Sequence, residues 1–443
     1  MVNALPEAGT TSAARDILRL AIPAFGALVA HPLFTLIDAA IVATLGTTSL
    51  AALGAGAQVF TTVTGLAIFL AYGTTAVVAR RVGAGQVDAG INAGVEGVAL
   101  GLGIGAAATA VTWLAGPQLL EWIGTSPEST PQALAYLRTI ALAFPFALAS
   151  MAATGVLRGL QDTATTLWVT VASVSTNAAL AAYFVLVARW GVAGSAWATV
   201  AAEALAGVLY ALVLAGRARR EHAGLRPSRS GLAAATRGAI PLFWRTVALR
   251  AVLILAVMVA ARIGDAQLAA YYVTLTIWYV LALSLDALAI AGQALLGKHL
   301  GAGTVDLARA ATWLMTKWGL WLGAILMALV LALRPWLSQL FGDDPSVQQM
   351  VASALVVVAL QQPLAGVVFV LDGVLLGAGD TWFLVGAQLF ALAAFAPAAW
   401  WVWQSRGSVT DLWLALGVFM LARATALLWR VRGTGWVVTG PTR

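Results

Sequence analysis

The chain has no cysteine, few charged residues and only three histidines. The absence of cysteine excludes disulfides, thiolate nucleophiles and cysteine-based zinc sites. His31, His222 and His299 are far apart and have no metal-ligand spacing, so we expect no metal site. Neither His-Glu-x-x-His nor Gly-x-Ser-x-Gly occurs. We therefore expect no catalytic residues, no enzymatic activity and no cofactor apart from a coupling ion.

The low content of charged residues indicates a membrane protein. Charged residues make up 10% of the sequence, whereas soluble domains carry about 25%. Hydrophobic residues make up 61%, and the mean hydropathy is +0.90. The first fifteen residues lack the pattern of a signal peptide, so we expect the first apolar stretch to be a retained helix. The net charge of +7 lies mostly between apolar segments, which argues against nucleic acid as a partner.

Apolar runs and helix breakers predict twelve transmembrane helices. Arg15, Arg80, Arg217 and most other basic residues fall into alternate connections, which predicts that both termini are cytoplasmic in a cytoplasmic (inner) membrane protein. The predicted helices cover residues 15–45, 48–80, 87–115, 131–158, 163–188, 192–216, 233–261, 266–297, 306–333, 347–375, 381–403 and 409–430.

The two halves of the sequence match at one constant offset, the distance from Pro23 to Pro241, here called the repeat offset. Proline, glycine and aspartate all keep this register, which indicates a duplicated six-helix unit. We predict an all-α membrane protein with twelve transmembrane helices in two six-helix lobes, related by pseudo-two-fold symmetry around a central cleft. The lobes are residues 1–215 and 233–443, joined by the cytoplasmic linker 216–232. Matching segments are Ile22-Pro23 with Ile240-Pro241, Gly83-Ala84-Gly85 with Gly301-Ala302-Gly303, and Asp162-Thr163 with Asp380-Thr381.

Asp38 lies in the middle of the first apolar run, residues 32–42. A charge at the centre of a bilayer costs about 2.5–3.5 kcal/mol, so such a residue usually has a function. The alternative is a structural hydrogen bond between helices. Pro23 and Pro32 precede it and each removes one helical hydrogen bond. They could couple protonation of Asp38 to bending of this helix, or form static kinks.

Several ordered motifs resemble the multidrug and toxic compound extrusion family, in particular its DinF-like branch. The resemblance covers essentially the whole chain and implies an antiporter that exports organic compounds in exchange for protons or sodium. The motifs are Pro32-Leu33-Phe34-x-Leu36-x-Asp38, Arg81-Val82-Gly83-Ala84-Gly85, Gly155-Val156-Leu157-Arg158-Gly159-x-x-Asp162-Thr163, Gly191-Val192-Ala193-Gly194-x-Ala196-x-Ala198-Thr199, Leu285-Asp286-Ala287-Leu288-Ala289-Ile290-Ala291-x-Gln293, and Leu371-Asp372-Gly373-x-x-x-Gly377-Ala378-Gly379-Asp380-Thr381.

The resemblance implies a cation-responsive site centred on Asp38, with Tyr136, Asn177 and Thr199 as polar neighbours. Without it, Asn177 and Thr199 could simply join helices, and Tyr136 could lie at the membrane interface. Ala181 stands where some archaeal relatives have a second carboxylate. Because sodium favours several oxygen ligands and a proton needs only one carboxyl group, we expect proton coupling, with sodium as the alternative.

Carboxylates that also lie inside apolar runs of predicted membrane helices include Glu203, Asp286 and Asp372. Glu203 follows Thr199 by one turn and could be a second titrating group. Asp286 and Asp372 could contact a cationic substrate or form a second proton site, or they could pair with Arg245 or Arg250. Two other basic residues, Lys317 and Arg423, lie nearer helix ends and are expected to snorkel. The pairs Gly155/Gly159 and Gly373/Gly377 are expected to allow close helix approach or a tight turn.

The predicted function is secondary active antiport by alternating access. The expected partners are small organic substrates, amphipathic and cationic, together with membrane lipids, and the expected oligomeric state is a monomer. Two alternatives stay open: a sodium-coupled drug antiporter and a flippase for lipid-linked saccharides. Such flippases often have a more basic cleft, whereas the candidate residues here are mostly acidic.

Overall fold

A computed structural model describes the backbone of residues 7–339 and 344–442, with side chains from residue 14 onward except that of residue 31. These residues form helices and no strand, and twelve segments are long and apolar enough to span a membrane. The all-α fold with twelve spans is thereby confirmed. The helices of the first half are α1 (Glu7–Ala43), α2 (Thr47–Leu66), α3 (Phe69–Gly83), α4 (Val87–Ile123), α5 (Thr130–Ile140), the 3₁₀ turn η1 (Ala141–Ala143), α6 (Phe144–Gly159), α7 (Thr163–Ala182), the π-helical turn η2 (Tyr183–Val187) and α8 (Val192–Arg220). Those of the second half are α9 (Arg229–Ile263), α10 (Asp265–Gly301), α11 (Val305–Leu337), α12 (Pro345–Gly377), α13 (Thr381–Ser405) and α14 (Val409–Arg432).

The chain divides into two compact units. The N unit is Ile22–Ile240, and the C unit is Pro241–Arg443 together with the segment that ends at Ala21. The division falls inside α1 and inside α9, in both cases just before a proline, Pro23 or Pro241. The units therefore do not coincide with the predicted lobes 1–215 and 233–443. The connection between α8 and α9 is shorter than the predicted linker 216–232, because it comprises only residues 221–228.

The start of α9 is tied to α4 of the N unit. Ser228 caps α9, since its hydroxyl oxygen accepts from the Gly231 amide at 2.9 Å. The same hydroxyl donates to the Glu96 carboxylate of α4 at 2.8 Å. These contacts explain why the first turns of α9 pack with the N unit.

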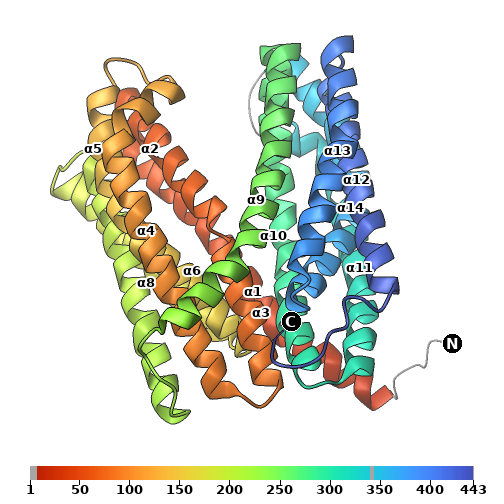
Figure 1. The fold of residues 1–443 in the computed structure, drawn as a ribbon. Coiled ribbons are helices and arrows are strands. Elements are labelled where there is room, and N and C mark those ends of the chain that lie inside the picture. Colours follow the sequence, from red (N-terminus) through yellow and green to blue (C-terminus); the bar gives the residue numbers. More distant parts are fainter. Residues whose placement is uncertain (1–6, 340–343, 443) are drawn as a thin grey trace. The chain divides into compact units, whose positions relative to one another are not determined.

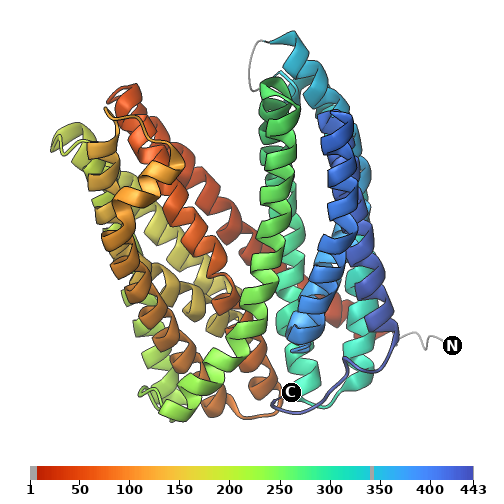
Figure 2. The same cartoon turned by 45° about the horizontal axis from the view of Figure 1, so that its top comes forward.

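Each unit is organised around its fourth span. In the N unit α6 packs against α3, α4 and α8, and in the C unit α12 packs against α10, α11 and α14 (Figures 1 and 2). These helices correspond to one another at the repeat offset. Helix boundaries keep the same register, because α3 and α10 end at Gly83 and Gly301. The turns that follow contain glycine with positive φ, 76° at Gly85 and 74° at Gly303, a conformation that favours glycine. The duplication predicted from the sequence is therefore visible in the fold.

Glycines allow the central helix to approach its neighbours closely. A Cβ atom added at Gly155 would lie 2.5 Å from the Ala71 carbonyl oxygen. One added at Gly373 would lie 2.3 Å from the Ala289 carbonyl oxygen. Real side chains do not fit at such distances, so the predicted role of these glycines in close helix approach is confirmed.

The N unit is less regular than the C unit. Its fourth span is interrupted at η1, whereas α12 continues through Pro363 without a break. The Ala141 carbonyl in η1 accepts a hydrogen bond from the Thr109 hydroxyl at 2.6 Å. The same carbonyl accepts from the Phe144 amide, so the Thr109 hydroxyl supplies a second bond where Pro145 has no amide hydrogen to donate.

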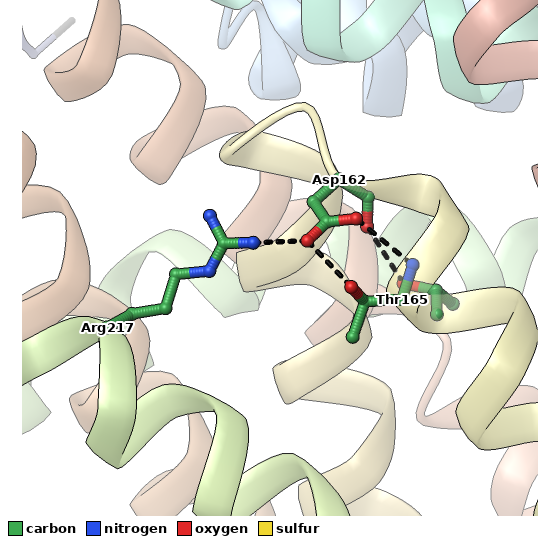
Figure 3. Close-up of polar contacts among 4 residues, drawn as sticks. Asp162, Thr165 and Arg217 are labelled. Carbon is green, nitrogen blue, oxygen red and sulfur yellow. Dashed lines mark hydrogen bonds and ion pairs between the residues drawn. The ribbon is translucent and has the colours of Figure 1, made fainter.

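Asp162 closes the turn between α6 and α7. Its carboxylate accepts from the Thr165 amide at 3.0 Å and from the Thr165 hydroxyl at 2.7 Å, and it forms an ion pair with Arg217 of α8 (Figure 3). The C unit repeats the arrangement, since Asp380 pairs with Arg430 of α14 at 2.6 Å. In each unit, an ion pair therefore connects the sixth span, α8 or α14, to the turn that follows the fourth span.

Asp162→Ala is expected to lower the unfolding midpoint in detergent more than Arg217→Gln. The alanine removes a helix cap worth about 0.5–2 kcal/mol. The Arg217 side chain is 38% exposed, so its ion pair contributes less than about 1 kcal/mol. Thermal unfolding of the two purified variants beside the wild type measures both effects. A larger loss in Arg217→Gln would show that the ion pair, not the cap, stabilises this turn.

Candidate functional site

Asp38 lies inside the N unit, and only 6% of its surface is exposed. Its carboxylate oxygen Oδ1 accepts a hydrogen bond from the Ser195 hydroxyl of α8 at 2.6 Å. Ser195 is itself fully buried. A single hydroxyl thus links the one carboxylate of α1 in this region to the first turn of α8. A charge-assisted bond of this kind is among the stronger hydrogen bonds in proteins.

The polar network continues for one turn along α8. The Asn177 amide of α7 donates to the Thr199 hydroxyl at 3.1 Å, and that hydroxyl donates to the Ser195 carbonyl at 3.2 Å. The amide oxygen of Asn177 is buried and has no hydrogen-bond partner. An unsatisfied buried acceptor is costly, so this oxygen is available to a proton donor or a cation.

Tyr136 is buried in the interior of the N unit. It is 1% exposed, and its hydroxyl group lies beside Ser195 and within electrostatic range of Asp38. Gly56 of α2 makes room for the ring, because a Cβ atom there would lie 2.3 Å from Tyr136 Cδ1. The structure therefore brings Asp38, Tyr136, Asn177 and Thr199 together. Their roles in coupling stay predictions.

Glu203 does not join this network. It is half-buried on α8, one turn beyond Thr199, and among the described residues it makes no hydrogen bond. Ala181 is fully buried. No group of three or more His, Cys, Asp or Glu side chains in the described part of the chain is placed to hold a metal ion.

Helix α1 continues through both of its prolines. Pro23 and Pro32 lie within one helical segment that runs from Glu7 to Ala43. Their predicted role in bending the helix stays a prediction. Asp38 follows Pro32 by six residues, so a change in the helix at Pro32 would move the carboxylate.

Ser195 is the site residue that the sequence did not single out. It occupies the variable position between Gly194 and Ala196 in a quoted motif. The available signal was its spacing, since Ser195, Thr199 and Glu203 recur every four residues and share one face of α8. This polar stripe on an apolar helix could have identified it.

The carboxylates predicted in the second half behave differently from Asp38. Asp372 of α12 pairs with Arg245 of α9 and also with Arg423 of α14. The alternative of pairing with Arg245 is therefore the one observed. The expectation that Arg423 snorkels is wrong, because Arg423 is buried and reaches Asp372 instead. Lys317 is exposed, and Asp286 is half-buried in α10 with an interaction of its own.

Each half of the chain matches the same family model. The MatE family model matches residues 23–183 and again residues 241–401. The chain belongs to the MatE family. Both matches begin and end at the repeat offset, which independently confirms the duplication. The family predicted from the sequence motifs is thereby confirmed, whereas the DinF-like branch stays a prediction.

Curated MatE relatives are similar over nearly the whole chain. Protein DETOXIFICATION 44, chloroplastic, of Arabidopsis thaliana is 32% identical, covering 98% of this chain and 85% of the relative. A probable multidrug resistance protein NorM of Pseudomonas syringae pv. tomato is 27% identical, covering 96% of this chain and 98% of the relative. The chain is thus a multi-pass membrane transporter of the MatE family.

Solved structures show the same fold at low sequence identity. The MATE transporter VcmN of Vibrio cholerae in its bent form has a TM-score of 0.88 at 19% identity, covering 96% of this chain and 98% of that one. A MOP superfamily transporter of Pyrococcus furiosus has a TM-score of 0.86 at 22% identity, covering 94% of this chain and 95% of that one. These likenesses support the architecture of the MatE chain.

Ser195→Ala is expected to slow substrate transport about tenfold or more. Hydrogen bonds to charged groups contribute about 1.5–3 kcal/mol, and 1.4 kcal/mol corresponds to a factor of ten. Transport by reconstituted protein measures the effect. Ser150→Ala is the matched control, because the Ser150 hydroxyl is buried in the same unit and has no hydrogen-bond partner. Equal rates in the two variants would contradict a role for the Ser195–Asp38 bond.

Proposed function

We propose that this protein is a secondary active antiporter that exports amphipathic organic compounds in exchange for protons, by alternating access. We further propose a monomer in the cytoplasmic membrane with both termini cytoplasmic. The observation that carries the proposal is Asp38, a carboxylate buried in the N unit and held by one hydroxyl. Relatives named probable multidrug resistance protein NorM support the substrate class.

The residues around Asp38 favour a proton over sodium as the coupling ion. A proton needs one carboxyl group with intermittent access to water. Sodium requires several oxygen ligands, and position 181, where the family resemblance implies a second carboxylate in some archaeal relatives, is alanine. Sodium coupling is the second candidate, and the unpartnered amide oxygen of Asn177 favours it.

The proposed cycle follows from the chemistry of a buried carboxyl group. Burial disfavours the ionised form, and hydration restores it. Ionised Asp38 accepts the Ser195 hydrogen bond while the substrate binds from the cytoplasm or the inner leaflet. Protonation from outside neutralises the group, changes the packing of α1 and lowers substrate affinity, so the compound leaves outward. The proton then escapes to the cytoplasm as the protein returns.

The membrane potential makes this cycle favourable energetically. When the exported compound carries no net charge, one charge moves inward per cycle, and through roughly 180 mV it releases about 4 kcal/mol, since 100 mV corresponds to about 2.3 kcal/mol. At 1.4 kcal/mol per factor of ten, that free energy sustains a substrate gradient on the order of a thousandfold. Exchange of a monocation for one proton is electroneutral and is driven by the pH gradient alone.

Transport in proteoliposomes tests the coupling ion. We expect a proton gradient to drive substrate movement equally well in sodium-free and sodium-containing buffer, and substrate addition to release protons. Transport that a sodium gradient drives at constant pH would make sodium the coupling ion. A lipid-flipping assay on the same vesicles, with a fluorescent lipid-linked saccharide, tests the flippase alternative, and we expect no flipping above protein-free vesicles.

A further inference from the structure

The C unit contains a buried cluster of two arginines and one carboxylate, here called the arginine triad: Arg245 of α9, Asp372 of α12 and Arg423 of α14. Both arginines bind the same carboxylate oxygen, Asp372 Oδ2, with Arg423 at 3.2 Å. Arg245 is 6% exposed and Arg423 is 7% exposed. Charged groups are therefore held together inside an apolar unit, where each of them is costly.

The charges of the arginine triad do not cancel. Two guanidinium groups each carry one positive charge and five N–H donors, whereas Asp372 supplies one negative charge. The Nε atom of Arg245 is buried and has no hydrogen-bond partner. The triad thus has an excess of one positive charge and a buried donor directed at no acceptor, two properties that an anionic group would satisfy.

The shared architecture does not require the triad. At the repeat offset, Asp372 corresponds to Thr154 and Arg245 corresponds to Ala27 of the N unit. Thr154 makes a neutral hydrogen bond to the Tyr210 hydroxyl at 3.0 Å, and Ala27 is buried. The pair α6–α8, which corresponds to α12–α14, therefore packs without an ion pair at this position. Because buried ion pairs add little net stability, a purely structural explanation of the triad is weak.

We infer that the arginine triad binds the carboxylate group of a substrate. Planar guanidinium groups match the two oxygens of a carboxylate, and Asp372 is the internal group that such a substrate displaces from one arginine. This inference rests on the proposed transport function and refines its substrate class. The compounds carried include amphipathic molecules with a carboxylate, zwitterions among them, and any positive group of a zwitterion would face the released Asp372.

Two fluorescent dyes that differ only in a carboxylate test the inference. Rhodamine 110 has a free carboxylate, and rhodamine 123 is its methyl ester. We expect the purified wild-type protein in detergent to bind rhodamine 110 about tenfold more tightly by fluorescence anisotropy, because one charge-assisted hydrogen bond is worth roughly that factor. Benzoate should displace rhodamine 110 but not rhodamine 123, whereas the neutral benzamide should displace neither selectively. This comparison needs no variant.

Variants of the triad separate binding from structure by the direction of the change. Arg245→Gln should abolish the preference for rhodamine 110, and Asp372→Asn should preserve or increase it, because it removes the competing carboxylate. Arg262→Gln is the control on the same helix, since Arg262 is exposed and stacks on Trp403 at 5.8 Å. It should leave both affinities unchanged.

Equal affinity of the wild type for the two dyes, or displacement of both dyes by benzoate, would overturn the inference. So would parallel losses for both dyes in Arg245→Gln and Asp372→Asn, the pattern of a structural cluster. The measurement uses no ion gradient, so it is independent of proton coupling. Asp38→Asn should keep the preference for rhodamine 110 even where transport is lost.

Discussion

Asp38→Asn is expected to abolish proton-coupled transport, reducing substrate-driven proton release to the level of protein-free vesicles. Asparagine has nearly the same shape as aspartate, and its amide oxygen can still accept the Ser195 hydrogen bond observed at 2.6 Å. The N unit should therefore fold. The amide group, however, cannot bind and release a proton at physiological pH, so the proposed cycle stops at its coupling step.

Reconstituted protein in vesicles with an internal pH dye measures this effect, and gel filtration in detergent confirms that the variant is folded. Asp306→Asn is the matched control, because Asp306 is exposed in the first turn of α11. It should release protons like the wild type. Full proton release by Asp38→Asn would show that another group, with Glu203 as the first candidate, carries the proton.

Gly366→Val is expected to prevent the C unit from folding. A Cβ atom at Gly366 would lie 1.9 Å from the Gly319 carbonyl oxygen, and one at Gly319 would lie 2.5 Å from the Gly366 carbonyl oxygen. The backbones of α11 and α12 therefore touch directly, and no flexible side chain can yield. Overpacking of a core typically costs about 1–3 kcal/mol, and separating two backbones should exceed that range.

Fluorescence-detected gel filtration of detergent-extracted protein reports this loss as a missing monodisperse peak. Gly386→Val on α13 is the matched control, because Gly386 is exposed and a Cβ atom there meets no atom within 4 Å. It introduces the same side chain in the same unit and should give a normal peak. A normal peak for Gly366→Val would mean that the two helices can move apart at low cost.

Hydrophobicity and the repeat were sufficient to predict the architecture. Long apolar runs leave a membrane protein no alternative to helices, and a register kept by prolines and glycines carries over directly to helix ends such as Gly83 and Gly301. The breaks inside spans were not predicted. The interruption at η1 lies beside Pro145, which has no amide hydrogen to donate to the Ala141 carbonyl, but the equivalent Pro363 lies inside the unbroken α12, so a proline alone does not predict a break.

Part of the candidate site was also predictable from hydrophobicity. Asp38 was evident because a charge in an apolar run is costly wherever it lies. Its partner Ser195 lies 157 residues away along the chain, and a serine on an apolar helix is too common to stand out. Arg423 was misjudged because its distance from a helix end suggested snorkelling, whereas a carboxylate on another helix determines its position. Such pairings depend on which helices become neighbours.

The division of α1 and α9 between units has a consequence for the history of the protein. The segment before Pro23 packs with the C unit, and the repeat-equivalent segment before Pro241 packs with the N unit. In each half of the sequence, the helical segment before the proline, here called the arm, therefore packs in the unit formed mainly by the other half. In a single-copy ancestor with this arrangement, two identical chains would exchange their arms, which is the definition of a domain-swapped homodimer. Gene fusion would then have made a reciprocal exchange between chains permanent within one polypeptide.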